Sequence, residues 1–341
     1  MRAFAENLKG LSAISETIEL LKKNNSAVSI CGVADAAKPH ISAVLNEGFD
    51  KCLIVTYDEQ RGRLLSANMS LFGQTSVYYP PRDVLFYQSD VSGKLIESER
   101  ISAVKYILSD EKITAVTTYD ALLDIIADPD SYDRSVITLK SGDEADKEKL
   151  EKKIAALGYE RCYQVSARGE FAVRGGIIDV YPLTAELPFR IEFWGDEIDT
   201  VRSFDPESQR SNEELDEASI YPASDLDTSS KMSGILDYFD EEKTLVILDE
   251  PVRLIERGDT ITEEFTSSIE RRKEIGLEIE GTIDTLRSSA DAAGRLQSFK
   301  RVMVTELDTQ SDLFPPEKKY SMDVKSLSPY NNKFELLIKD L

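Results

Sequence analysis

Short apolar runs alternate with amphipathic runs along the first third of the chain. The apolar runs are largely free of charge, which is typical of strands buried on both faces. The amphipathic runs repeat apolar residues every three or four positions, which indicates helices with one buried face. The expected strands are residues 27–33, 51–57, 75–80 and 113–119. The expected helices are residues 14–21, 39–48, 58–73 and 98–110. This alternation predicts a parallel sheet that is covered by helices on both faces.

The alternation stops near Asp128 and gives way to a strand-rich pattern. A lysine- and glutamate-rich helix comes first, with Leu150 and Ile154 on its apolar face. Several short strand patterns follow, and the Gly195-Asp196 pair between two of them suits a tight hairpin turn. This part of the chain therefore predicts a separate, strand-rich domain.

The alternating pattern resumes beyond a polar segment, residues 211–231, which we interpret as a linker. Residues 244–250 and 300–307 are strand-like, and the long segment between them is helical and mostly polar. The economical prediction is one α/β domain that is interrupted by an inserted strand-rich α+β domain. The expected boundaries are 1–130 and 213–341 for the two parts of the α/β domain and 131–212 for the insert.

Composition restricts the classes of function. The chain has 341 residues and a net charge of −22, and an acidic surface repels a phosphate backbone, so direct DNA or RNA binding is disfavoured. Its three cysteines and one histidine lack metal-ligand spacing, so no metal site is expected. The sequence shows no apolar signal core and no run of membrane-spanning length, so we expect a cytoplasmic protein without a membrane partner.

One loop resembles the nucleotide-binding phosphate loop, G-x-x-x-x-G-K-[ST]. Gly32 and Lys38 stand where the first glycine and the phosphate-binding lysine belong. Ala37 replaces the second glycine, and Pro39 replaces the hydroxyl that holds magnesium. Asp35 adds a carboxylate where phosphates would lie. We interpret the loop as kept in structure but chemically inactive, and an ordinary strand-to-helix turn is the alternative.

A second sequence resembles part of a nucleotide hydrolase. The apolar strand that ends in Asp249 and Glu250 has the form of the acidic motif that holds magnesium and activates water. Pro251 follows it, and the phosphate loop that these acids would serve is altered. We therefore interpret the pair as a degenerate remnant and expect no cofactor for this chain. Weak residual nucleotide binding stays open, because Lys38 and both acids are kept.

The run PFRIEFW, residues 188–194, separates two faces of one strand. Its alternation places Arg190, Glu192 and Trp194 away from the core. Tryptophan and arginine are enriched among the residues that dominate binding energy at protein interfaces, so this face is a candidate protein-binding surface. The alternative is that Trp194 folds back over the turn at Gly195, with Arg190 in a surface ion pair of little worth.

Residues 168–211, RGEFAVRGGIIDVYPLTAELPFRIEFWGDEIDTVRSFDPESQRS, resemble the signature shared by the UvrB and Mfd families of bacterial DNA repair proteins. The closing FDPESQRS is more similar to the Mfd family. The resemblance implies a degenerate RecA-like α/β domain with an inserted domain that binds UvrA. By position, the UvrA-binding residues are Arg174, Arg190 and Trp194, with Glu192 as an addition. Replacing either arginine with glutamate is expected to abolish or greatly weaken UvrA binding and to leave the fold intact.

The resemblance to the Mfd family implies further that this chain is the non-catalytic N-terminal part of a DNA translocase. ATP, magnesium, RNA polymerase and double-stranded DNA would bind to other domains. In that family a C-terminal domain covers the UvrA-binding surface until the motor engages, which implies autoinhibition by an intramolecular contact. The aromatic stretch that grips DNA in the UvrB family is reduced here to residues 78–81. The alternative function is a nucleotide-dependent DNA-processing enzyme like UvrB, which Ala37, Pro39 and the absence of helicase motifs disfavour.

Overall fold

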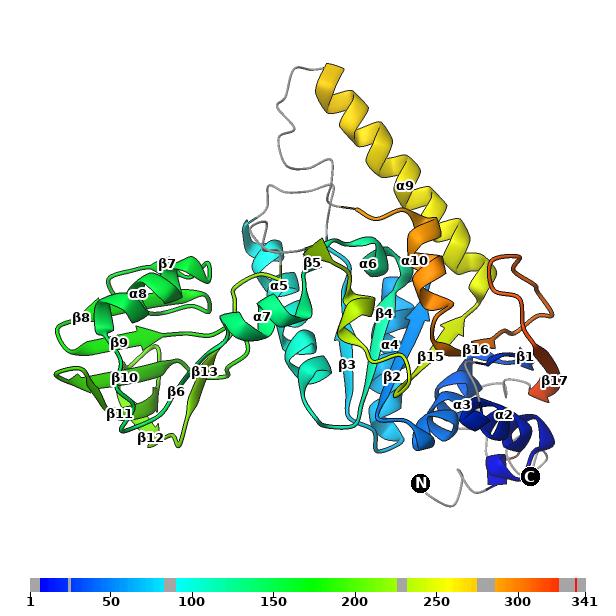
Figure 1. The fold of residues 1–341 in the computed structure, drawn as a ribbon, viewed down its shortest axis with the longest axis horizontal. Coiled ribbons are helices and arrows are strands. Elements are labelled where there is room, and N and C mark those ends of the chain that lie inside the picture. The colour runs from blue at the N-terminus through cyan, green and yellow to red at the C-terminus, as the bar shows by residue number, and fades with distance from the viewer. Residues whose placement is uncertain are drawn as a thin grey trace.

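The protein is organised around two separate sheets, one of seven strands and one of six (Figure 1). The computed structural model describes residues 7–23, 26–82, 90–225, 232–274, 286–324 and 335. The six-stranded sheet lies to one side of the larger body, and the chain passes to it and back through a narrow connection (Figure 1).

The seven-stranded sheet is parallel throughout. In spatial order its strands are β17 (Lys318–Val324), β1 (Ala27–Val33), β16 (Lys300–Val304), β15 (Thr244–Asp249), β2 (Lys51–Thr56), β4 (Ile113–Thr118) and β3 (Ser76–Tyr79). Successive side chains of a strand point to opposite faces. In β2, Cys52 and Ile54 accordingly enter one core and Leu53 and Val55 enter the other.

Helices cover both faces of this sheet, as the alternation of the sequence predicts. The helices of one layer are α2 (Ser12–Lys23), α3 (Lys38–Leu45) and α4 (Glu59–Leu71), which supply buried side chains to the core that contains Ile54. Those of the other layer are α5 (Asp90–Leu108), α6 (Tyr119–Leu123), α9 (Pro251–Glu274) and α10 (Ser289–Leu296), which supply the core that contains Leu53. Helix α9 extends well beyond the sheet (Figure 1). None of the helices in the described ranges is both long and apolar enough to span a bilayer.

The six-stranded sheet belongs to the insert and is mostly antiparallel. Its strands in spatial order are β12 (Ser211–Glu214), β11 (Glu197–Phe204), β10 (Phe189–Trp194), β9 (Ile177–Val180), β8 (Glu170–Arg174) and β7 (Glu160–Arg161). One face packs on α8 (Lys147–Ala156), through Leu150 and Ile154. Phe189, Ile191 and Phe193 of β10 contact this same core, as their alternation predicts.

The chain enters and leaves the insert along two paired strands. After α7 (Pro129–Ser135), strand β6 (Ile137–Leu139) runs antiparallel to β13 (Ala218–Ile220). The sequence predicts a polar linker from Ser211, but the structure has β12 and β13 in that segment. All four residues of β12 are exposed, so its polar sequence gives no alternation, and backbone pairing with β11 alone makes it a strand. A shorter pair joins β5 (Ile126–Ala127) and β14 (Met232–Ser233).

A buried charge network lies where the chain returns from the insert. Arg100 of α5 is fully buried and donates to Asp225 at 2.8 Å, to Asp124 at 2.6 Å and to the Pro80 carbonyl at 2.7 Å. The hydroxyl of Tyr79 donates to Asp225 at 2.7 Å. Tyr79, from the stretch compared above with a DNA-gripping hairpin, is therefore a core residue here. The network links the returning chain to β3 and α5.

The predicted fold class is confirmed: a parallel α/β sheet and a separate strand-rich sheet occur in one chain. The two α/β segments predicted on either side of the insert meet in the same sheet, because β15 lies between β2 and β16. The hairpin turn at Gly195 is also present, between β10 and β11, with a backbone φ of +67°.

Candidate functional site

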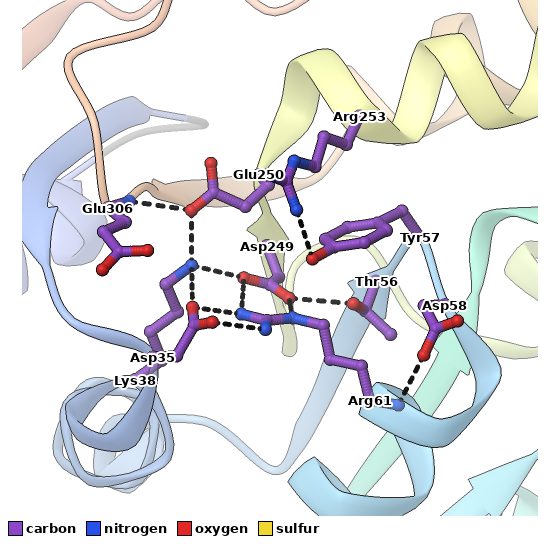
Figure 2. Close-up of polar contacts among 10 residues, drawn as sticks. All are labelled: Asp35, Lys38, Thr56, Tyr57, Asp58, Arg61, Asp249, Glu250, Arg253 and Glu306. Carbon is purple, nitrogen blue, oxygen red and sulfur yellow. Dashed lines mark hydrogen bonds and ion pairs between the residues drawn. The ribbon is translucent and has the colours of Figure 1, made fainter.

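The first candidate site lies at the carboxyl ends of β1, β2 and β15, where open parallel sheets bind their ligands. Five charged side chains meet there, and we call them the loop cluster (Figure 2). Its members are Asp35, Lys38, Arg61, Asp249 and Glu250. Three of them, Lys38, Asp249 and Glu250, were singled out in the sequence as remnants of a nucleotide site, and the fold brings them together.

Strand β17 packs directly against the backbone of the loop that resembles a phosphate loop. Gly32 has a φ of +76°, and a Cβ at this position would lie 1.8 Å from the Met322 carbonyl oxygen. The N–H of Ala34 donates to the Val324 carbonyl at 3.0 Å, and that of Ala37 donates within the loop at 2.9 Å. Backbone N–H groups of this kind bind phosphate in a working loop. Here these two are used by the protein itself.

Lys38 is held by the acids of the cluster. Its side chain is 3% exposed, and Nζ lies 2.5 Å from Glu250, 2.8 Å from Asp249 and 3.0 Å from Asp35. Burial by itself lowers the pKa of the ammonium, but the three carboxylates, Asp249 foremost, raise it overall. Pro39 follows in the first turn of α3, where a missing N–H costs nothing.

Arg61 of α4 is the second cation of the cluster. Its guanidinium contacts both oxygens of Asp35, at 2.6 and 2.7 Å, and also binds Asp249. Hydrogen bonding by Arg61 holds the pKa of Asp35 far below its usual range. The Thr56 hydroxyl donates to Asp249 at 2.8 Å. Sequence analysis missed Arg61 because no motif contains it. The one available signal was that three acids around a single lysine leave charge to be balanced.

The three carboxylates have the spacing of metal ligands, because oxygens of Asp35, Asp249 and Glu250 lie within 4.8 Å of one another. Lys38 contacts all three. Glu250 has a φ of +57°, a conformation that costs a non-glycine residue about 1 kcal/mol. Its carboxylate also accepts the Glu306 N–H at 2.7 Å. The cluster is thus a closed network of two cations and three acids.

The second candidate site is the face of the six-stranded sheet that points away from α8, which we call the outer face. Residues directly opposite on neighbouring strands share a face. The register pairs Arg190 with Asp179 on one side and with Arg202 on the other. Glu192 and Trp194 follow Arg190 at alternate positions of β10, and the extra residue of the bulge in this strand pair lies on β11, so Trp194 is on this same face. The outer face therefore carries Arg174, Asp179, Arg190, Glu192, Trp194 and Arg202.

Asp179 is the centre of the outer face. The whole residue is buried, and its carboxylate accepts from Nε of Arg190 at 2.7 Å and from Nη2 at 3.0 Å. It also accepts from Arg174 at 2.5 Å. An isolated buried carboxylate is costly, and two guanidinium groups remove that cost here. Sequence analysis did not select Asp179, although an acid alternating with apolar residues in a buried strand was a usable signal.

Arg190 is a more deeply buried residue than its sequence predicts. Its side chain is 12% exposed, its guanidinium lies 4.6 Å from the centre of the Phe204 ring, and it donates to the Gln209 carbonyl at 3.1 Å. Asp179 raises the pKa of Arg190 further. The alternative of a weak surface ion pair therefore does not describe this residue. Glutamate at this position would face buried Asp179, so we no longer expect the fold to tolerate it.

Trp194 is largely exposed to solvent. Its exposed fraction is 83%, which excludes the alternative that it folds back over the Gly195 turn. Glu192, two residues earlier on the same face, is half-buried. An exposed tryptophan on one face with arginines is the composition of a protein interface rather than of a catalytic centre. The structure thus brings Arg174 and Arg190 together on Asp179, and Trp194 stands on the same face.

A family of known protein domains matches the part of the chain that contains the six-stranded sheet. Residues 137–226 match the UvrB interaction domain. The UvrB interaction domain includes all six strands that form the outer face, from β7 to β12. The resemblance found in the sequence, to UvrB and to transcription-repair-coupling factors, is confirmed.

Several bacterial DNA repair proteins are similar to the chain over more than half of its length. The transcription-repair-coupling factor of Bacillus subtilis is 30% identical over 200 residues, which are 58% of this chain and 17% of that protein. That of Haemophilus influenzae is 30% identical over 192 residues, 56% of this chain and 17% of the relative. The UvrABC system protein B of Thermosipho africanus is 29% identical over 235 residues, 64% of this chain and 35% of that protein. The matched region thus spans about a sixth of the coupling factors and about a third of the UvrB protein.

Proposed function

We propose that this chain is a non-catalytic recruitment module of nucleotide excision repair, in which the outer face binds UvrA. The observation that carries the proposal is that the region matched to the UvrB interaction domain exposes Trp194 on the same sheet face as a preformed arginine pair. Similarity to transcription-repair-coupling factors supports a role in transcription-coupled repair, with RNA polymerase and DNA engaged by other domains.

The chemistry of the face fits a protein partner. Trp194 supplies a large apolar area at little entropic cost, because two torsion angles fix its side chain. Arg174 is 38% exposed and uses one of its donors on Asp179, so its other N–H groups can meet a carboxylate of the partner. Direct DNA binding gains no support from this face, since the chain as a whole carries a charge of −22.

Titration of the chain with purified UvrA tests the proposal. We expect saturable binding that Trp194→Ala weakens tenfold or more, since truncating an interface hot spot costs about 2 kcal/mol or more. Stability should not change, because the side chain is 83% exposed. Tyr163→Ala is the matched control: it removes an aromatic side chain that is 87% exposed in the same domain but belongs to the loop between β7 and β8 rather than to a strand of the outer face. Equal binding by the wild type and Trp194→Ala would refute the assignment of the face.

The recruitment role predicts how the isolated chain should behave. In longer relatives of the coupling-factor type we propose that a C-terminal domain covers the outer face, as an autoinhibitory contact. Residues 1–341 expressed alone should therefore bind UvrA without any activating step. If the chain bound UvrA only after an activating ligand was added, that part of the proposal would fall.

We also propose that the loop cluster binds no nucleotide. Support comes from Ala37 and Pro39 in the loop, from the N–H of Ala34 that Val324 occupies, and from the three acids on Lys38. A phosphate group would have to displace these acids from the lysine and would meet their negative charge. The expected result of calorimetric titration with ATP and magnesium is no heat of binding at millimolar nucleotide. Saturable binding that is lost in Lys38→Ala would establish the alternative function, a nucleotide-dependent enzyme like UvrB.

A further inference from the structure

We propose that Asp179 is a positioning residue of the recruitment surface: it fixes Arg174 in the orientation that meets the partner, and Arg190 acts through it rather than by contact. This inference rests on the proposed function of the outer face. It assigns different roles to residues that the sequence treats alike, and it adds one residue that no motif selects.

The first step concerns Arg190, whose donors are already used. Nε and one Nη of the guanidinium bind Asp179, and the other Nη binds the Gln209 carbonyl. The Phe204 ring covers one side of the group. Gln209 itself has a φ of +60°, the one other positive φ of a non-glycine residue in the described chain besides Glu250. A guanidinium that is held on three sides and is 12% exposed has little left to offer a partner.

The second step concerns Arg174, which is the outward member of the pair. It shares Oδ2 of Asp179 with Arg190 and keeps 38% of its side chain in solvent. An arginine loses rotamer entropy when a partner immobilises it. Because Asp179 already restrains Arg174, most of that cost falls on folding rather than on binding. Arg174 and Arg190 together carry one more positive charge than Asp179 neutralises. That charge remains available to a carboxylate of the partner.

A third arginine provides an internal reference. Arg202 stands opposite Arg190 on β11, on the same face, and its side chain has no hydrogen bond or ion pair to any described residue. All six basic residues between positions 159 and 214 are arginines. Arg174 and Arg202 can therefore be compared without any difference in side-chain type. Arg174 and Arg202 differ in their connection to Asp179.

The decisive experiment is a double-mutant cycle on UvrA binding. Asp179→Asn keeps the shape of the side chain and one acceptor but removes the charge. We expect it to weaken binding about tenfold in the wild-type background and to have no further effect in the Arg174→Ala background. In the Arg202→Ala background it should keep its full tenfold effect. A tenfold loss in all three backgrounds would mean that Asp179 only maintains the fold, and the proposal would be overturned.

A second readout requires neither UvrA nor a variant of Asp179. Rotation about the Cζ–Nε bond of arginine is measurable by NMR in the wild-type chain, with Arg174→Ala and Arg202→Ala used to assign the signals. We expect Arg174 to rotate slowly and Arg202 rapidly, and equal rates would overturn the proposal even if Asp179→Asn did not fold. If the wild-type chain failed to bind UvrA at all, the proposed function would fall, and the rotation rates would still decide whether Asp179 orders Arg174.

Discussion

Replacing Lys38 with methionine should destabilise the α/β domain strongly. Methionine keeps the unbranched stem, so packing changes little, and the loss is that of the ammonium. Lys38 is 3% exposed and contacts three carboxylates, of which Asp249 is 4% and Glu250 13% exposed. The variant leaves these two acids with fewer partners in a largely dry site.

The expected magnitude follows from which partners remain. Breaking a buried ion pair by removing one member costs about 3–5 kcal/mol. Arg61 stays on Asp249, which retains part of that pair, and Asp35 is half exposed, so its contact with Lys38 counts for little. The estimate is therefore the lower end of the range, about 3 kcal/mol. Lys22→Met, which removes an exposed lysine paired with Glu19 at 2.8 Å, should cost less than about 1 kcal/mol.

Urea unfolding followed by far-UV circular dichroism at pH 7 measures both variants, with the transition of the α/β domain separated from that of the insert by hydrogen exchange of β1 and β15. The pKa of Lys38 is raised in the folded state, so its contribution is complete below its ordinary pKa and is lost as the pH rises through the raised value. The difference between wild type and Lys38→Met should accordingly shrink at strongly alkaline pH. Equal stability of Lys38→Met and Lys22→Met at pH 7 would refute the reasoning.

Three further predictions concern other parts of the structure. Gly32→Ala should cost about 2–4 kcal/mol and speed amide exchange along β17, because its Cβ would lie 1.8 Å from the Met322 carbonyl oxygen; unchanged exchange would contradict this. Arg190→Glu should destabilise the insert by about 3–5 kcal/mol in thermal unfolding, because it sets a second acid against buried Asp179; a fully folded variant would show that the pair is not structural. Burial would raise the pKa of Asp237, but hydrogen bonds from a hydroxyl, a backbone amide and a guanidinium lower it to about 2. This acid therefore contributes stability above about pH 4 that is lost as the pH falls toward 2, roughly 1 kcal/mol after allowance for its partial exposure, and Asp237→Asn should flatten the acid limb of the stability profile.

The regular part of the fold was predictable because the spacing of apolar residues within each segment indicates its strands and helices. The buried strand of residues 51–57 and the helix with Leu150 and Ile154 both occur as predicted, since each buries a face that its own sequence defines. Strand β12 was not predictable, because four exposed polar residues have no pattern and only their neighbour makes them a strand. Its pairing depends on β11, which the local sequence of β12 does not encode.

The residues of the candidate sites also fall into two groups, those that a sequence motif selects and those that it does not. Lys38 and the acid pair at Asp249 could be selected from motifs, because their positions in the chain match known chemistry. Arg61 matches no motif, because its importance arises from a side chain that lies far away in sequence. Arg61 and Asp249 are 188 positions apart. A pairing of that kind becomes visible once the sheet has brought the two strand ends together.

The pairing of β6 with β13 makes the insert a portable unit. Neighbouring strands lie about 5 Å apart, so the chain departs from the α/β domain and returns to it across the width of one strand pair. An insertion with adjacent ends can be gained, lost or exchanged during evolution while the host sheet keeps its strand order. For protein engineering, the same geometry marks residues 137–220 as the segment to graft when a recruitment surface is to be moved onto another scaffold.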